Sequence, residues 1–171
     1  MDPIWIETEM GSAVSELFCL VAMVLVAQVS SVPKVTLGDI EARLFYKGTG
    51  RLSDNVLSRK REFTFFNTII GEGDAEEAAD DLLISVQMSS GKWGSPDENE
   101  QLVPSPVVIK VVDQNGKVLG QRTFDSVLTS TTGSEYKALW LTDVTCAGNV
   151  TVTATFAGQA KSAKLSLGCG E

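Results

Sequence analysis

The chain has 171 residues, of which 43% are hydrophobic and 21% are charged, and its net charge is −8. These proportions are those of a globular domain and exclude a wholly disordered chain. The acidic balance argues against nucleic acid as a partner, because phosphates need Lys and Arg, and the lack of histidine removes the commonest general base and catalytic zinc ligand.

The N-terminal segment resembles an export signal. Residues 17–27 form an unbroken apolar run, which is too short to span a bilayer but has the length of a signal-peptide core. The residues before Val32 form an acceptable cleavage site, so we expect residues 1–31 to be a signal peptide and the protein to be periplasmic, secreted or on the cell surface. Because no Lys or Arg precedes Lys34, a misassigned start codon, an uncleaved membrane anchor and a buried helix stay open as alternatives.

Residues 32–171 are expected to form a single all-β domain. Runs rich in Val, Thr, Ile, Leu and Phe, most of them alternating, predict about eight strands, at 40–46, 62–70, 82–88, 107–113, 117–124, 136–141, 149–156 and 161–168. This spacing is typical of a sandwich or barrel, and we expect an antiparallel β-sandwich of immunoglobulin-like architecture. The apolar run 62–70 is expected to be a central strand, and residues 75–83 to contain one short helical turn.

The loop at residues 71–81 reads GEGDAEEAADD and is strongly acidic. Calcium takes six to eight oxygen ligands, which clustered loop carboxylates supply. If this loop binds calcium, the first candidate ligands are Asp74, Glu76, Asp80 and Asp81. The spacing does not match an EF-hand loop, and the alternative is a solvated loop whose charges discourage pairing at a sheet edge.

Residues 89–106 are polar, contain three prolines and are expected to connect two sheets. Trp93 lies in this stretch and is a candidate binding residue, because an exposed aromatic ring serves as a sugar platform or a protein contact. The alternative is a lid that folds back over the end of the core. The second aromatic candidate, Trp140, lies in an alternating strand, where core packing is the default expectation.

Two hairpins are predicted. Asn115-Gly116 between two alternating runs is a strong hairpin signal, because both residue types accept positive φ. A turn at residues 157–158 gives the last two strands a register that pairs Phe156 with Gln159, Val152 with Ala163 and Val150 with Leu165.

The same register opposes two cysteines. Continuing the ladder places Cys146 opposite Cys169, where directly opposed Cα atoms lie about 4.5–5.5 Å apart, within disulfide range. We therefore predict a Cys146–Cys169 disulfide at the base of the hairpin, with two free thiols as the alternative. Cys19 would leave with the signal peptide, so the mature chain would hold an even number of cysteines.

Three functions are compatible with these features. The first is a non-enzymatic binding or structural module of the cell envelope, without a cofactor, whose protein or glycan partner contacts loops 47–61, 71–81 and 89–105. It would contact a membrane only if the N-terminal segment stays uncleaved. The second is a calcium-dependent recognition or adhesion domain that uses the acidic loop. The third, a small hydrolase with two catalytic carboxylates, needs two acids that face one bond, which a sequence cannot establish.

Overall fold

The computed structural model describes residues 34–58, 63–64, 74–90, 101–129, 133–144 and 146–168. These residues belong to one compact unit, Pro33–Glu171. Nearly all of their regular structure is β-strand, beside one 3-10 turn, η1 (Val56–Ser58). No helix among the described residues is long and apolar enough to cross a membrane.

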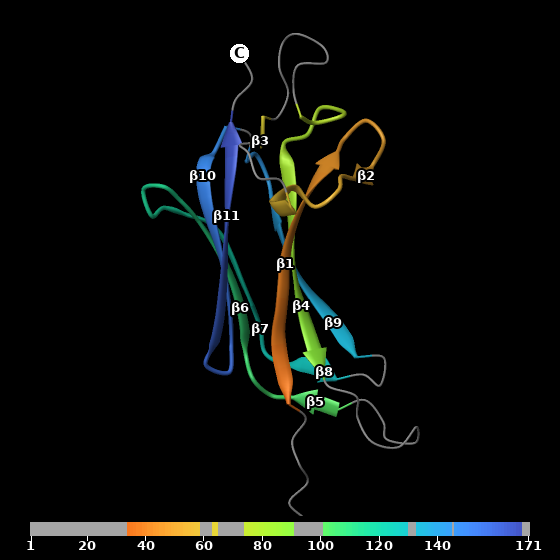
Figure 1. Ribbon diagram of the computed structural model, residues 1–171, viewed down its shortest axis with the longest axis vertical. Helices are drawn as coiled ribbons and strands as arrows, with labels where there is room; N and C mark the ends of the chain where they lie inside the picture. Colours follow the sequence, from red (N-terminus) through yellow and green to blue (C-terminus); the bar gives the residue numbers. More distant parts are fainter. Residues whose placement is uncertain are drawn as a thin grey trace, which may run out of the picture. The chain divides into compact units, whose positions relative to one another are not determined.

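The strands form two main sheets and one small ribbon (Figure 1). In spatial order, the first sheet contains β2 (Arg51–Leu52), β1 (Val35–Tyr46), β4 (Asp81–Ser90) and β9 (Ser134–Leu141). The second contains β3 (Phe63–Thr64), β11 (Gln159–Gly168), β10 (Gly148–Phe156), β6 (Val107–Asp113) and β7 (Val118–Phe124). The ribbon pairs β5 (Gln101–Val103) with β8 (Val127–Thr129). All pairs are antiparallel except β3 with β11.

One hydrophobic core lies between the two main sheets. Alternation along β4 buries Leu82, Ile84, Val86 and Met88, and alternation along β10 buries Val150, Val152 and Ala154. These side chains belong to one cluster that joins both sheets. Each fully buried Leu, Ile or Val contributes about 1.5–3 kcal/mol relative to exposure. The alternation in the sequence therefore produces a two-layered, all-β, sandwich-like fold, as expected.

The hairpin of β10 and β11 has the predicted register. Phe156 pairs with Gln159, Val152 with Ala163 and Val150 with Leu165. The turn places Ala157 at φ 45° and Gly158 at φ 78°, as a two-residue turn between right-twisted strands requires. The ladder is followed as far as Gly148 opposite Leu167.

The predicted hairpin of β6 and β7 is confirmed, but its turn differs from the expected one. Gly116 has φ 81° and donates its N–H to the Asp113 carbonyl at 3.1 Å, whereas Asn115 is not among the residues with positive φ. The Asp113 carboxylate accepts hydrogen bonds from the N–H groups of Asn115 and Lys117, both at 2.8 Å. This aspartate stabilises a longer loop, which needs a left-handed residue only at the glycine.

One local prediction lies mostly outside the described residues, and another was wrong. Of the run 62–70 the structure describes only β3, which pairs with β11 at one end of the described strand order, and the central position predicted for the whole run stays untested. The expected helical turn at 75–83 is absent: residues 78–80 have no regular structure and β4 begins at Asp81. Burial of Leu82 and Ile84 in the sheet outweighs the helix propensity of the Ala and Glu residues before them.

Candidate functional site

A pocket of about 360 Å³ opens on the side of the sandwich where β1 and β11 lie next to each other. We call this side the β1–β11 seam. The residues that line the pocket come from β1, from the segment containing η1 and from β11: Asp39, Ile40, Asn55, Leu57, Ser58, Lys161, Ser162 and Ala163. The volume is near the lower end for small-molecule sites, so the pocket suits a small group or a short stretch of chain.

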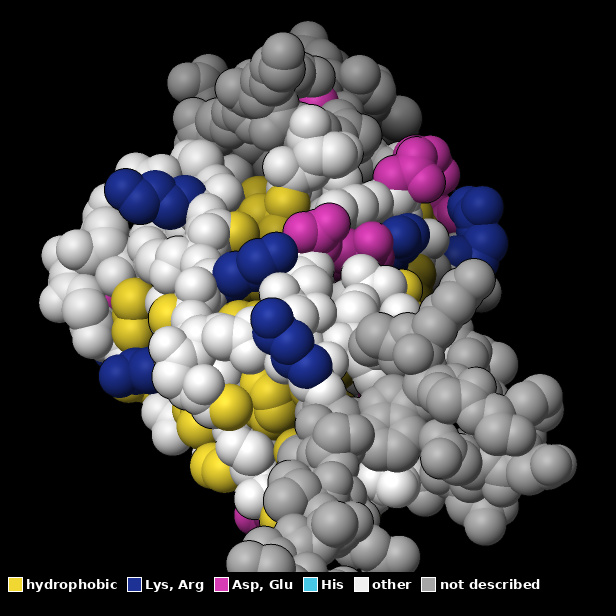
Figure 2. Space-filling view, turned by 60° about the horizontal axis from the view of Figure 1, so that its bottom comes forward, with side chains coloured by type: hydrophobic (Ala, Val, Ile, Leu, Met, Phe, Trp, Pro, Cys, Tyr) yellow, Lys and Arg dark blue, Asp and Glu magenta, His cyan; other side chains and the backbone are white. Residues whose placement is uncertain are grey.

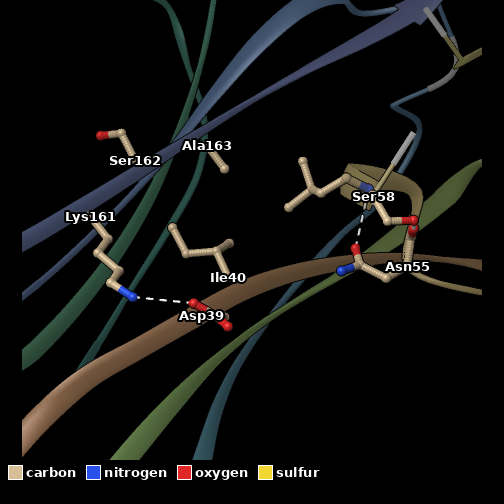
Figure 3. A pocket seen from close by; sticks show the side chains of 8 residues that line it. Asp39, Ile40, Asn55, Ser58, Lys161, Ser162 and Ala163 are labelled. Carbon is tan, nitrogen blue, oxygen red and sulfur yellow. Dashed lines mark hydrogen bonds and ion pairs between the residues drawn. The ribbon is translucent and has the colours of Figure 1, made fainter. Parts of the chain in front are cut away.

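The pocket combines apolar and polar side chains. Ile40 and Leu57, partly buried against the core, provide apolar surface with Ala163. Beside them Lys161 Nζ lies 3.2 Å from Asp39 Oδ1 and joins the two strands (Figure 3). The side chain of Asp39 is 88% exposed and that of Lys161 is 44% exposed. Because both side chains are exposed, both charges are accessible to a ligand. An exposed ion pair of this kind contributes little to stability.

Side chains protect much of the β1 edge that faces this seam. Gln159 accepts a hydrogen bond from the Leu37 N–H at 2.9 Å and donates one to the Val35 carbonyl at 3.1 Å. The side-chain amide oxygen of Asn55, Oδ1, accepts the Ala42 N–H at 3.1 Å, and the Ser53 hydroxyl accepts the Leu44 N–H at 2.9 Å. These contacts occupy positions that another strand would otherwise pair with.

Between these protected positions lies Ile40. In an antiparallel ladder the outward groups belong to every second residue. Since Ala42 and Leu44 point their N–H groups away from β4, Ile40 does the same. Among the described residues no hydrogen bond reaches the outward N–H or carbonyl of Ile40. A bulge between Leu37 and Ile40 interrupts the ladder just before this residue, so the open stretch of edge is short and lies at the pocket.

The opposite side of the sandwich, the β7–β9 seam, is closed by direct contacts. Arg122 of β7 donates a hydrogen bond from Nη1 to the Ala138 carbonyl of β9 at 3.0 Å, and its guanidinium carbon lies 4.5 Å from the centre of the Phe124 ring. A Cβ atom on Gly120 would lie 2.3 Å from Leu141 Cδ2. A side chain at position 120 would therefore require the Leu141 side chain to shift.

Two of the acidic residues proposed as calcium ligands, Asp80 and Glu76, face basic side chains. Asp80 is ion-paired with Lys47, and Glu76 lies 3.7 Å from Arg51, which is also paired with Glu77 at 3.0 Å. Asp81 accepts hydrogen bonds from Trp140 Nε1 at 3.3 Å and from the Asp143 N–H at 3.4 Å. Asp74 lies in the bend at 74–77. The described residues contain no group of three or more potential metal ligands, and calcium binding stays an untested prediction.

The pKa of Lys47 is raised above its ordinary value. The hydrogen bond with Asp80 is the main cause. Desolvation opposes it, and the negative charges of Asp80, Asp81 and Asp143 add to the increase. The protonated amine is therefore favoured by this acidic end of the molecule. This arrangement connects the tip of the β1–β2 hairpin to the acidic loop.

Trp140 does not pack in the core, which corrects the expectation for this residue. It points to the outer face of its sheet, is 42% exposed and meets Phe45 edge-on, with ring centres 5.2 Å apart. Its neighbours Leu139 and Leu141 are the buried residues of the strand. Because side chains alternate along the strand, only one set of residues faces the core, and here that set contains Leu139 and Leu141.

Two other predicted site residues lie outside the described residues: Trp93 and Cys169. Cys146 is described and has φ 63° just before β10. Cys146 lies in a turn outside the described ladder, which ends with Gly148 opposite Leu167, so the disulfide stays a prediction.

The pocket is only partly where the sequence had placed the partner contacts. Asn55, Leu57 and Ser58 come from the predicted loop 47–61, whereas the remaining lining residues come from two strands. One signal was available: the hairpin register puts Gln159 and Lys161 on the same face as Val152 and Val150. Polar side chains at the end of an apolar face are a known protection of edge strands.

Charges of both signs are interspersed with uncharged side chains on the face shown in Figure 2. Hydrophobic side chains reach this face in several separate places between Lys and Arg side chains. The described part of this face therefore has no continuous basic stripe of the kind that follows a phosphate backbone.

Comparison with known proteins identifies no family. No protein-family model matches the sequence, and no curated protein matches it. Among solved structures, the chain is similar to a β-glucuronidase of Bifidobacterium dentium in complex with coumarin-3-O-glucuronide, with 15% identity and a TM-score of 0.38. The match covers 79% of this chain and 18% of the glucuronidase chain. A likeness this weak supports no conclusion about fold or function.

Proposed function

We propose that this chain is a non-enzymatic binding module of the cell envelope that holds a protein partner at the β1–β11 seam. The observation that supports this function is the pocket at Ile40, where apolar surface, an accessible ion pair and an unoccupied stretch of strand edge meet. Protein contacts use such combinations of an apolar anchor and polar rim. The opposite seam is filled by its own residues and offers no comparable opening among the described residues.

An extracytoplasmic location is part of this proposal. It is supported by the signal-like segment 1–31 and by the pairing of Cys146 with Cys169 that the hairpin register implies, since disulfides form in exported proteins. We further infer an immunoglobulin-like architecture. The support is that the described strands change between the two main sheets five times along the chain. For example, β4 and β9 neighbour each other in one sheet, while β6 and β7 lie between them in sequence but belong to the other.

Site-specific photo-crosslinking in the source cell tests this function. A benzoylphenylalanine at Ser58, an exposed residue that lines the pocket, should crosslink a partner protein, whereas the same group at Gln121, an exposed position on β7, should not. The purified partner should then bind the unmodified chain and bind the Ala163→Leu variant at least tenfold more weakly, because the leucine fills the pocket. Unfolding midpoints of both proteins provide the control for folding.

Two results would contradict the proposal. One is that the group at Ser58 crosslinks no protein although the chain is folded and exported. The other is that the purified partner binds the Ala163→Leu variant as tightly as the unmodified chain.

A further inference from the structure

We infer that the pocket at Ile40 binds a short extended peptide segment of the partner, in antiparallel orientation, through two main-chain hydrogen bonds and one apolar side chain. This inference rests on the proposed function and names the chemistry of its ligand. It is carried by the backbone of β1 rather than by the pocket volume alone.

The first step concerns the main chain. A residue that pairs with Ile40 from outside the sheet can donate its N–H to the Ile40 carbonyl and accept the Ile40 N–H, which is the hydrogen-bonded pair of an antiparallel ladder. Ile40 offers both groups, since the described residues leave them without a partner. An extended peptide is the ligand that satisfies one donor and one acceptor on the same residue with matching geometry.

The second step concerns the side chain. Residues that face each other in an antiparallel pair point their side chains to the same face. The Ile40 side chain packs against the core at the base of the pocket, beside Leu57 and Ala163. The peptide residue opposite Ile40 therefore directs its own side chain onto this apolar surface, and a branched aliphatic residue suits a pocket of about 360 Å³.

The third step limits the length of the segment. The next outward N–H groups of β1 are occupied: Leu37 by Gln159 on one side, and Ala42 by Asn55 on the other. A long added strand would have to break these hydrogen bonds. The partner therefore contributes only a short extended stretch, from a loop or from a terminus, rather than a complete strand.

Pairing with β11 is the competing arrangement, and the geometry disfavours it. In the hairpin of β10 and β11, the Ser162 hydroxyl lies 3.2 Å from the Thr153 hydroxyl in an exposed position. The side chain of Ser162 thus lies on the outer face of its sheet. A peptide residue paired with Ser162 would point its side chain outward and leave the apolar base of the pocket empty.

Synthetic peptides test the inference on the purified full chain. The probe is an acetylated and amidated threonine hexapeptide with leucine at its third position, and its matched control is the same peptide with N-methylleucine, which lacks the N–H that pairs with the Ile40 carbonyl. Binding is followed through the NMR amide shifts of the chain. We expect the probe to shift Ile40 and Asp39 first and to bind about three- to tenfold more tightly than the methylated control, the effect of one hydrogen bond.

A replacement of the central leucine by asparagine should weaken binding by a similar factor or more, because the asparagine amide would lose its water at an apolar surface. On the protein side, Ala163→Leu should remove the Ile40 shift. Because the peptide variants leave the protein unchanged, a loss of binding by them does not reflect misfolding.

The outcomes separate this inference from the function on which it rests. Equal affinity of the probe and its N-methylated control, or no Ile40 shift up to about 10 mM peptide, where even an interaction of roughly −3 kcal/mol is detected, would overturn the inference. If the peptides fail but the crosslinked partner binds the Ala163→Leu variant more weakly than the unmodified chain, the proposed function stands and only this inference is wrong. If neither partner nor peptide binds at the pocket, both are wrong.

Discussion

The edge strands at the two lateral seams of this sandwich are protected in different ways. At the β7–β9 seam the edge strands meet directly, through the Arg122 hydrogen bond to Ala138 and the close approach of Gly120 to Leu141. At the β1–β11 seam the strands remain apart, and side chains such as Gln159 and Asn55 protect single positions of the edge. A sheet edge can thus be protected while a defined opening is kept, and we place the function of the molecule at the protected but open seam.

The predicted disulfide should have the largest effect, because it fixes the end of β11, one strand of the open seam. Changing Cys146 to Ser should lower the free energy of unfolding by about 2–4 kcal/mol, since the bridge restricts the unfolded chain. Chemical unfolding under oxidising conditions measures this loss, and the unmodified chain in reductant is the matched comparison. An unchanged midpoint together with a free-thiol signal from the unmodified chain would mean that the bridge does not form.

The closed seam should not tolerate added volume. Gly120→Ala adds a methyl group 2.3 Å from Leu141 Cδ2. Because this contact is too short, we expect a loss of about 1–3 kcal/mol in the free energy of unfolding. The control is Ala163→Val at the open seam, where the pocket has room and the change should stay within about 0.5 kcal/mol. Equal effects of the two substitutions in urea unfolding would remove the distinction between the seams.

The sequence anticipated the closed parts of the molecule better than the open one. Local alternation predicted seven of the described strands, and the turn at 157–158 predicted the register of β10 and β11, because both depend on residues near each other in the chain. The open seam depends on contacts such as that of Gln159 with Leu37, which are 122 residues apart. The outward position of Trp140 was missed for a similar reason, since only the assembled core shows that Leu139 and Leu141 occupy the inner face.

The protection of the β1 edge should depend on Gln159. Its replacement by Ala leaves the Leu37 N–H and the Val35 carbonyl without their partner, and we expect a loss of about 1–2 kcal/mol in the free energy of unfolding. The amide hydrogen of Leu37 should also exchange faster with solvent. Gln159→Glu, which still accepts the Leu37 N–H but cannot donate to Val35, should lie between the two, and normal Leu37 exchange in the alanine variant would argue against this role.

Arg122 should have a smaller effect at the closed seam. Arg122→Met keeps much of the aliphatic stem but loses the hydrogen bond to Ala138 and the contact of the guanidinium with Phe124. Both interactions are exposed, so we expect a loss of about 1 kcal/mol, measured by thermal unfolding. Lys164→Met on the exposed side of β11 is the matched control and should leave the midpoint unchanged; an effect as large as that of Arg122→Met would point to charge alone.

The smallest effect concerns Lys47, away from both seams. Because the hydrogen bond with Asp80 raises its pKa in the folded chain, its contribution to stability is present below the unfolded pKa of about 10.4 and is lost as the pH rises through the folded pKa. NMR titration of the Lys47 side chain should show this raised pKa, and Asp80→Asn should lower it. A Lys47 pKa that does not respond to the substitution would contradict the assigned cause.

The most direct test of the open seam is amide hydrogen exchange at Ile40. In the free chain we predict that the Ile40 amide exchanges quickly although it lies within β1, whereas the amides of Leu37 and Ala42, bonded to Gln159 and Asn55, exchange slowly. The partner captured by crosslinking should then slow exchange at Ile40 and leave the β7–β9 seam unchanged. A slow Ile40 amide in the free chain, or protection by the partner at β7 and β9 instead, would contradict the account.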